Sequence, residues 1–225
     1  MRALFRSLAA VLLFASPAAG QEITTQFWPE IDTFVRLGEN ARIYVPLSNT
    51  REGTADPERD GTVGVYFDYY VLPIAKVGLH ADDSRRRKVL LRAGYGYTAA
   101  GDGQPATNTL LAEATGRAIL PWELLASLRN RFDLNFTGGH FDPRYRIRLR
   151  LERDIVLGKA TLTPYAYGES FYSFDNGNWF RTRAALGLEF HLWERFVPEV
   201  YFQRDYNASS ADVNGFGLVV SIYLR

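Results

Sequence analysis

The chain contains no cysteine among its 225 residues, so no disulfide can stabilise the fold and no thiol is available for a lipid anchor. Neither sign of charge is in excess, because 26 basic residues are balanced by 25 acidic ones and leave a net charge of +1. This balance lacks the basic excess that is typical of nucleic-acid-binding proteins. Long apolar runs are missing as well. Beyond the N-terminal region, no stretch reaches the roughly 18 to 20 apolar residues that a transmembrane helix needs.

The first twenty residues predict a secretory signal peptide. Two arginines (Arg2 and Arg6) precede an apolar run over residues 8–15, and small residues follow at positions 18–20. We expect cleavage before Gln21, which gives an exported protein with one domain over residues 21–225. The alternative, a membrane anchor, would need a longer apolar run.

The most informative stretch covers residues 144–151 and reads RYRIRLRL. Strict alternation of charged and apolar side chains predicts an extended strand with two opposite environments. In a soluble sheet the arginines would face water, whereas in an outer-membrane barrel they would point into a polar interior. The pattern of the remaining strands is needed to distinguish a soluble sheet from an outer-membrane barrel.

The same alternation recurs along the whole chain. The segments are bounded by turn signals, and many run to ten or more residues, against about 5 to 6 in soluble domains and about 9 to 11 in membrane strands. Abundant aromatic residues also favour strands. The eleven clear strands cover residues 26–37, 41–49, 62–72, 88–98, 109–120, 126–136, 144–151, 161–169, 181–190, 199–206 and 216–224.

Nearly every predicted strand has one continuous apolar face, which favours lipid over water. Short connections near Pro121, Gly158 and Trp193 alternate with longer polar ones, as periplasmic turns and outer loops do in membrane barrels. Trp122 and Trp193 beside short turns, and Trp179 beside a longer loop, could lie at the two membrane interfaces. The sequence therefore predicts an all-β, up-and-down antiparallel transmembrane barrel in the bacterial outer membrane. The alternative is a soluble periplasmic sandwich or lipocalin-like barrel that binds a small ligand.

The number of strands is constrained if both chain ends lie in the periplasm, because an up-and-down barrel then needs an even count. Adding a short strand over residues 74–80 to the eleven clear ones gives about twelve. The alternative is about ten, with one N-terminal segment outside the wall.

The inner faces carry charges of both signs. Same-face arginines lie about 6.6 Å apart on a strand and repel one another unless carboxylates or water separate them. A crosslinked ion-pair network that fills the barrel is the favoured interpretation, and a narrow passive pore with anion preference is the alternative. We expect the network to comprise Arg129, Arg131, Asp133, Arg144, Arg146, Arg148, Arg150, Glu152, Glu169, Arg181, Arg183, Glu189, Glu199 and Asp205.

An outer-membrane lipid hydrolase is a third possibility. Such an enzyme needs a serine and a histidine near the membrane interface, with an acid or amide to orient the imidazole. His140 follows two glycines in a loop, and Ser170 and Ser173 approach the same end, but no motif links them. We therefore predict no catalytic residue, and neither a cofactor nor a metal site.

Several segments resemble an uncharacterised group of Gram-negative outer-membrane proteins, the domain of unknown function 2490. The resemblance rests on QFWPEIDTFVRLGENARIYV, on the strand around Gly94–Tyr97, on the arginines of residues 144–150 and on Glu169. It implies an outer-membrane barrel with no established activity. Independently of the resemblance, we expect lipid around the barrel, and small ions or solutes in the lumen if the lumen is open. We expect a monomer. The chain departs from the usual aromatic last residue of such barrels, because it ends in Arg225.

Overall fold

The computed structural model describes residues 23–52, 59–74, 83–100 and 105–224. The predicted signal peptide lies outside these ranges. Among the described residues, no helix has the length and apolarity needed to cross a membrane.

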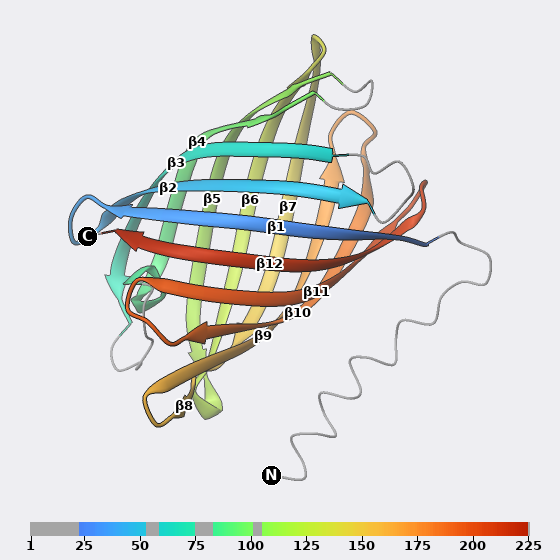
Figure 1. The fold of residues 1–225 in the computed structure, drawn as a ribbon. Helices are drawn as coiled ribbons and strands as arrows, with labels where there is room; N and C mark the ends of the chain where they lie inside the picture. The colour runs from blue at the N-terminus through green and yellow to red at the C-terminus, as the bar shows by residue number, and fades with distance from the viewer. Residues whose placement is uncertain (1–22, 53–58, 75–82, 101–104, 225) are drawn as a thin grey trace.

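The predicted all-β barrel is confirmed. Eleven strands form a closed wall, and the twelfth strand, β8, pairs only with the start of β9 (Figure 1). Two 3-10 turns complete the described elements: η1 (Asp83–Arg86) and η2 (Pro121–Glu123). The strands are β1 (Ile23–Arg36), β2 (Ala41–Glu52), β3 (Arg59–Pro73), β4 (Arg87–Thr98), β5 (Thr107–Leu120), β6 (Leu124–Thr137), β7 (His140–Glu152), β8 (Ile155–Leu157), β9 (Ala160–Ser173), β10 (Asn178–His191), β11 (Phe196–Asn207) and β12 (Asp212–Leu224).

The barrel closes through a parallel pair, β1 with β12, whereas every other neighbouring pair is antiparallel. An odd number of up-and-down strands brings the first and last together running the same way. The two ends of the described chain therefore lie at opposite openings of the barrel. We call the opening where β1 begins the N-terminal rim, and the opening where β12 ends the C-terminal rim.

The twelfth strand is not the one expected from the sequence. Residues 75–80 of the expected strand lie outside the described ranges, and Ile74 lies beyond the end of β3. The twelfth strand is instead β8. It pairs with the start of β9 in the same register in which β7 pairs with the rest of β9, so β7 and β8 lie in line along β9. The wall therefore has eleven strands, an odd number, instead of the expected even number, and it closes through a parallel pair. The longest connection, residues 74–86, also shares the C-terminal rim with the short turns, contrary to the expected separation of short and long loops.

The two faces of the wall differ as the alternation predicts. On the outer face Leu149 is 51% exposed and Phe67 is 46% exposed. On the inner face Asp68 is fully buried and Glu169 is 1% exposed. Apolar groups therefore point outward and charged groups are enclosed, the reverse of a water-soluble barrel with an apolar core.

One side of the interior is filled by aromatic rings rather than charges. The rings of Tyr223, Phe34 and Tyr44 stack in sequence, with centroids 4.9 Å and 4.7 Å apart, and Tyr66 follows at 5.5 Å. Tyr66 on β3 lies over Gly94, its partner on β4. The glycine in mid-strand thus makes room for a large inner side chain.

Replacing Gly94 by alanine is expected to destabilise the barrel by about 1 to 3 kcal/mol. The added methyl group would lie 2.3 Å from the backbone oxygen of Val65 and 2.6 Å from Cα of Tyr66, so the wall itself would have to shift. Gly116→Ala is the matched control, because its methyl group would meet nothing within 4 Å. Equal stability of the two variants in urea unfolding from detergent or lipid would contradict this packing.

Candidate functional site

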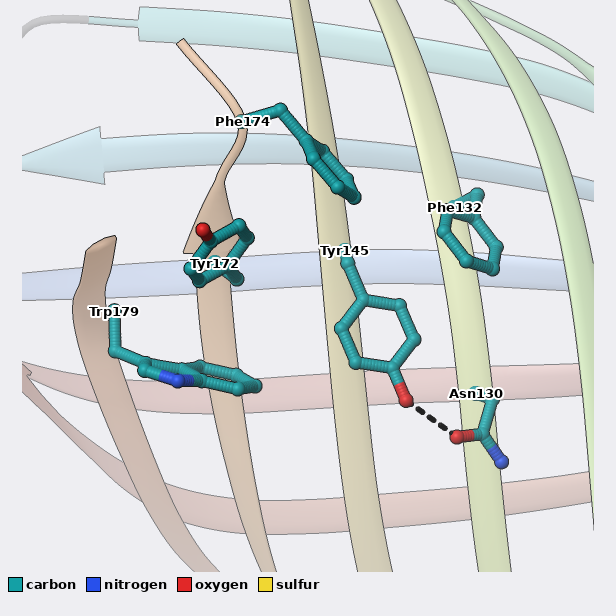
Figure 2. A pocket seen from close by; sticks show the side chains of 6 residues that line it. All are labelled: Asn130, Phe132, Tyr145, Tyr172, Phe174 and Trp179. Carbon is teal, nitrogen blue, oxygen red and sulfur yellow. Dashed lines mark hydrogen bonds between the residues drawn. The ribbon is translucent and has the colours of Figure 1, made fainter. Parts of the chain in front are cut away.

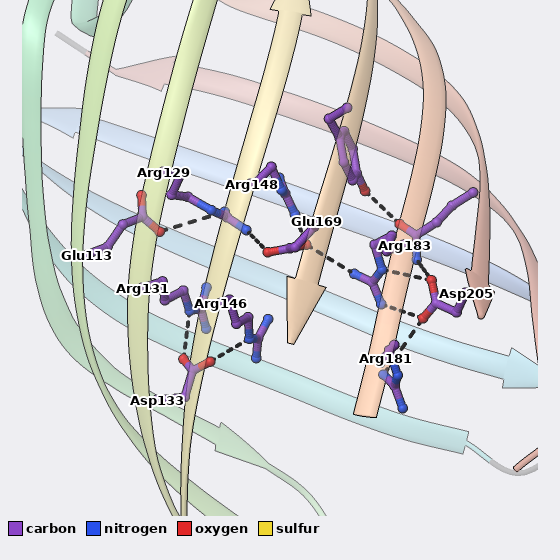
Figure 3. Close-up of polar contacts among 12 residues, drawn as sticks. Glu113, Arg129, Arg131, Asp133, Arg146, Arg148, Glu169, Arg181, Arg183 and Asp205 are labelled. Carbon is purple, nitrogen blue, oxygen red and sulfur yellow. Dashed lines mark hydrogen bonds and ion pairs between the residues drawn. The ribbon is translucent and has the colours of Figure 1, made fainter. Parts of the chain in front are cut away.

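The centre of the interior is organised around the carboxylate of Glu169 on β9. It accepts a 2.5 Å hydrogen bond from Nη2 of Arg129 on β6 and a 2.8 Å bond from Nη2 of Arg148 on β7. Nη1 of Arg183 on β10 lies 3.9 Å from the same carboxylate (Figure 3). One buried anion therefore holds three arginines that come from three different strands.

Two more carboxylates extend this arrangement to either side. Asp133 on β6 lies 2.6 Å from Nε of Arg131 and 2.6 Å from Nε of Arg146. On the other side, Asp205 on β11 forms a two-pronged pair with Arg183, with both contacts at 2.8 Å. Such bidentate geometry is the strongest form of guanidinium–carboxylate pairing.

A second layer lies nearer the C-terminal rim. Arg150 on β7 contacts both Glu152, at 2.5 Å, and Glu189 on β10. Arg85 from η1 contacts the same two carboxylates, at 3.3 Å from Glu152. His191 lies 3.3 Å from Glu189. The two arginines and two glutamates therefore crosslink the wall to the loop between β3 and β4.

The turn η1 lies inside the barrel opening. Ser84 is 1% exposed, its carbonyl oxygen accepts a 2.9 Å hydrogen bond from Arg117 on β5, and its hydroxyl lies 3.4 Å from Nη2 of Arg42 on β2. Together with the Arg85 pairs, these contacts reach β2, β5, β7 and β10. The turn thus spans the lumen at the C-terminal rim.

A cavity of about 240 Å³ remains between η1 and the central layer. Arginines and carboxylates line it from several strands, among them Arg129, Arg148 and Glu113. The Glu113 carboxylate is 3.7 Å from Arg129, which is longer than a direct hydrogen bond. The cavity is therefore polar and large enough to hold water.

Tyrosine rings support the arginines of β7. The guanidinium of Arg148 lies 4.1 Å from the ring centroid of Tyr167, and that of Arg150 lies 3.8 Å from the centroid of Tyr165. Contacts of this length are attractive because the ring face carries partial negative charge. Each inner arginine of this strand is therefore held by a carboxylate and by a ring.

Most of the predicted inner residues lie around Glu169, Asp133, Asp205 or Glu189. Arg144 and Glu199 lie outside these clusters, and Arg181 lies at the edge of the one around Asp205. Arg144 pairs with Asp142 at the N-terminal rim, where its side chain is 39% exposed. Glu199 accepts a hydrogen bond from the Tyr165 hydroxyl and has no arginine partner among the described residues. Arg181 is bound mainly by Asn207, at 2.8 Å, and lies 3.7 Å from Asp205.

The predicted network omits another cluster and the loop arginine. Asp68 on β3 is fully buried between Arg42 and Arg92, at 2.7 Å and 2.6 Å. All three positions follow the inner phase of their strands, so the alternation contained the signal. Arg85 follows no strand, and no periodic pattern could have placed it in the lumen.

Within the described residues, no hydrogen bond or ion pair joins His140 to Ser170 or Ser173. His140 lies 3.0 Å from Asp175 in the turn after β9, with 72% of its side chain exposed. Ser173 faces the interior, where it binds Asn176, whereas Ser170 lies on the outer face. Within the described ranges, no group of three or more metal-ligating side chains is placed to hold an ion.

A comparison with protein-family models matches residues 25–215 to a protein of unknown function, DUF2490. The chain belongs to the DUF2490 family. Comparisons of this DUF2490 protein with curated proteins and with solved structures give no match. The family assigns no activity, so function has to be argued from the barrel itself.

Proposed function

We propose that this DUF2490 protein is an outer-membrane β-barrel whose interior is a structural ion-pair network that closes the barrel to free diffusion. The observation that supports it is the reversed distribution of side chains, with apolar groups outside and charges inside. Lipid is the solvent that this distribution suits.

The outer face favours a membrane because its apolar surface continues around the wall. Soluble monomers rarely expose a continuous apolar patch larger than a few hundred Å². Here nearly every strand contributes exposed large apolar side chains, which include Phe27, Ile31, Leu47, Val65, Phe67, Leu91, Tyr95, Leu110, Leu128, Phe132, Leu149, Leu186, Val200, Phe202, Phe216 and Leu218.

The interior favours closure because η1 lies across the lumen at the C-terminal rim, while the ion pairs of the central layer fill the space along β6, β7, β9 and β10. Glu169 links the neighbouring wall strands β6, β7 and β10 through one carboxylate, and Arg85 reaches from η1 to β7 and β10. A hydrated solute would have to break several buried pairs to pass. Breaking one such pair costs about 3 to 5 kcal/mol, which is enough to make passage rare.

A narrow anion path is the second candidate function. It is favoured by the polar cavity of about 240 Å³ beside Arg129 and Arg148. Rearrangement of η1 would connect this cavity to the C-terminal rim, and the arginines of β7 would then favour anions.

The test is reconstitution of the full protein after detergent extraction from isolated outer membranes. In planar bilayers we expect no unitary conductance. Recovery in the soluble fraction would contradict the membrane location, and regular conductance steps would contradict the closed interior. If such steps occur, the anion path requires the reversal potential to shift when Arg146 and Arg148 are replaced by glutamine.

A further inference from the structure

A β-bulge in β10 turns Trp179 to the outer face. Trp179 pairs with Tyr172 on β9, but Arg181 pairs with the adjacent Phe171, so Phe180 is an extra residue. Without the bulge, Trp179 would share the inner face with Arg181 and Arg183. Bulges commonly re-aim a side chain at a functional place. Here the indole is 51% exposed on the outside of the wall.

The re-aimed indole completes a circuit of five aromatic rings from four neighbouring elements. Starting at Phe132 on β6, the circuit passes through Tyr145 on β7, Trp179 on β10, Tyr172 on β9 and Phe174 after β9. The successive centroid distances are 5.0, 6.3, 5.4 and 5.3 Å, and Phe174 returns to Phe132 at 6.4 Å. We call these five residues the aromatic cage.

The aromatic cage surrounds a hollow of about 440 Å³ (Figure 2). Successive ring centroids lie 5.0 to 6.4 Å apart, a spacing comparable to the roughly 6 Å over which a ring face attracts a cation. Phe132, Phe174 and Trp179 are 47%, 50% and 51% exposed, so their surfaces are accessible. A single compact group in the hollow could therefore contact several of the rings at once.

The chemistry of the lining favours a large, weakly hydrated cation. All six lining residues are uncharged, and the sixth, Asn130, accepts a 2.6 Å hydrogen bond from the Tyr145 hydroxyl. No arginine or lysine lines the hollow to attract an anion. Aromatic faces are electron-rich, and cages of them recognise quaternary ammonium groups.

The position of the aromatic cage indicates a lipid as the source of that cation. Phe174 directly follows β9, and Trp179 is the second residue of β10, so the cage opens near the N-terminal rim. At a rim, the outer face of a membrane barrel meets lipid head groups. We propose that the aromatic cage binds the trimethylammonium head group of a membrane lipid. The lipid source rests on the proposed membrane location, whereas the cage chemistry does not.

Two other occupants fit the shape less well. A second copy of this barrel would present a broad convex wall, which is much wider than the hollow and could not enter it. An acyl chain would fit, but aliphatic side chains would bind it as well as aromatic rings do, because an uncharged chain is not attracted by the ring quadrupoles. The cage concentrates rings where neighbouring parts of the outer face carry Leu149 and Leu186.

The decisive experiment compares choline with its neutral carbon isostere, in which a tert-butyl group replaces the trimethylammonium group. The full protein is kept in a maltoside detergent, which contains no ammonium group. Saturation-transfer NMR of the ligand methyl protons is expected to show millimolar binding of choline and binding of the isostere at least fivefold weaker. Equal binding of both would overturn the cation site in favour of a purely apolar one, and absence of binding would overturn it altogether.

Variants locate the site. Trp179→Leu and Tyr172→Leu are each expected to weaken choline binding about fivefold to tenfold. Tyr145→Phe keeps the ring and should bind as the native protein does. Trp193→Leu is the matched control, because Trp193 is 57% exposed in the turn between β10 and β11 at the opposite rim. An equal loss in the Trp193 variant would refute the assignment to the cage.

The lipid source is tested in nanodiscs that contain phosphatidylcholine and phosphatidylglycerol in equal amounts. We expect phosphatidylcholine to be enriched among lipids retained by the native protein and this enrichment to vanish in Trp179→Leu. Choline binding without enrichment would refute the lipid source. A protein that stays soluble without detergent would instead refute the membrane location, so the two failures can be told apart.

Discussion

Glu169→Ala is expected to lower the free energy of unfolding of the barrel by about 3 to 5 kcal/mol. The carboxylate is 1% exposed and contacts Arg129, Arg148 and Arg183. Its removal leaves three guanidinium groups enclosed together without their common counter-ion. Removing one partner of a buried ion pair costs far more than the pair contributes, because the remaining charge cannot return to water.

The measurement is urea unfolding of the reconstituted protein, followed by tryptophan fluorescence and by the heat-dependent shift in electrophoretic mobility. Glu169→Gln should recover part of the loss, since the amide still accepts hydrogen bonds but carries no charge. Glu123→Ala is the control, because the Glu123 side chain is 84% exposed and lies 4.0 Å from Arg153. An exposed pair of this kind contributes about 0 to 1 kcal/mol. Similar costs for Glu169 and Glu123 would show that the interior is well hydrated.

The faces of the wall could be predicted from the sequence because a strand has only two environments. Once the RYRIRLRL stretch assigns arginine to one face, the period of two extends the assignment along each strand. The buried positions of Asp68, Asp133 and Glu169 follow from that rule. The closed barrel follows from the length and number of such strands.

The partners inside the barrel could not be predicted in the same way. Arg129 and Glu169 are separated by 40 residues, and their contact depends on the stagger between β6, β7 and β9. Alternation assigns a face, but it does not determine which residues of neighbouring strands lie opposite. The parallel closure of β1 on β12 was missed for a different reason: the eleven clear strands are the eleven wall strands, but the assumption that both chain ends lie on one side required an even number.

Local departures from the period of two also lie beyond what alternation can predict. The bulge at Phe180 shifts Trp179 to the outside, and an unbroken alternation would place this ring with the arginines. Arg85 enters the lumen from a turn, where no alternation exists. Both features involve an interruption of regular structure, and both lie at places to which we attribute a role.

Leu149→Arg is expected to cost about 2 to 4 kcal/mol of folding free energy when the outer face meets lipid. Leu149 lies near the middle of the line formed by β7 and β8. It pairs with Leu128 on β6 and with Gly168 on β9, and it is 51% exposed. An arginine there would have to reach an interface several residues away. In a water-soluble barrel the same side chain would be solvated, and the change would stay within about 0.5 kcal/mol.

Leu192→Arg provides the comparison, because Leu192 is 49% exposed in the turn that follows β10 at the C-terminal rim. Near the interface an arginine costs only about 0 to 1 kcal/mol. Reversible folding into lipid vesicles in urea measures both variants under the same conditions. A cost at Leu149 that clearly exceeds the cost at Leu192 would establish hydrocarbon around the middle of the wall. Equal costs would place the barrel in water and remove the physical basis of the membrane proposal, because a depth-dependent penalty is the property that distinguishes lipid from solvent.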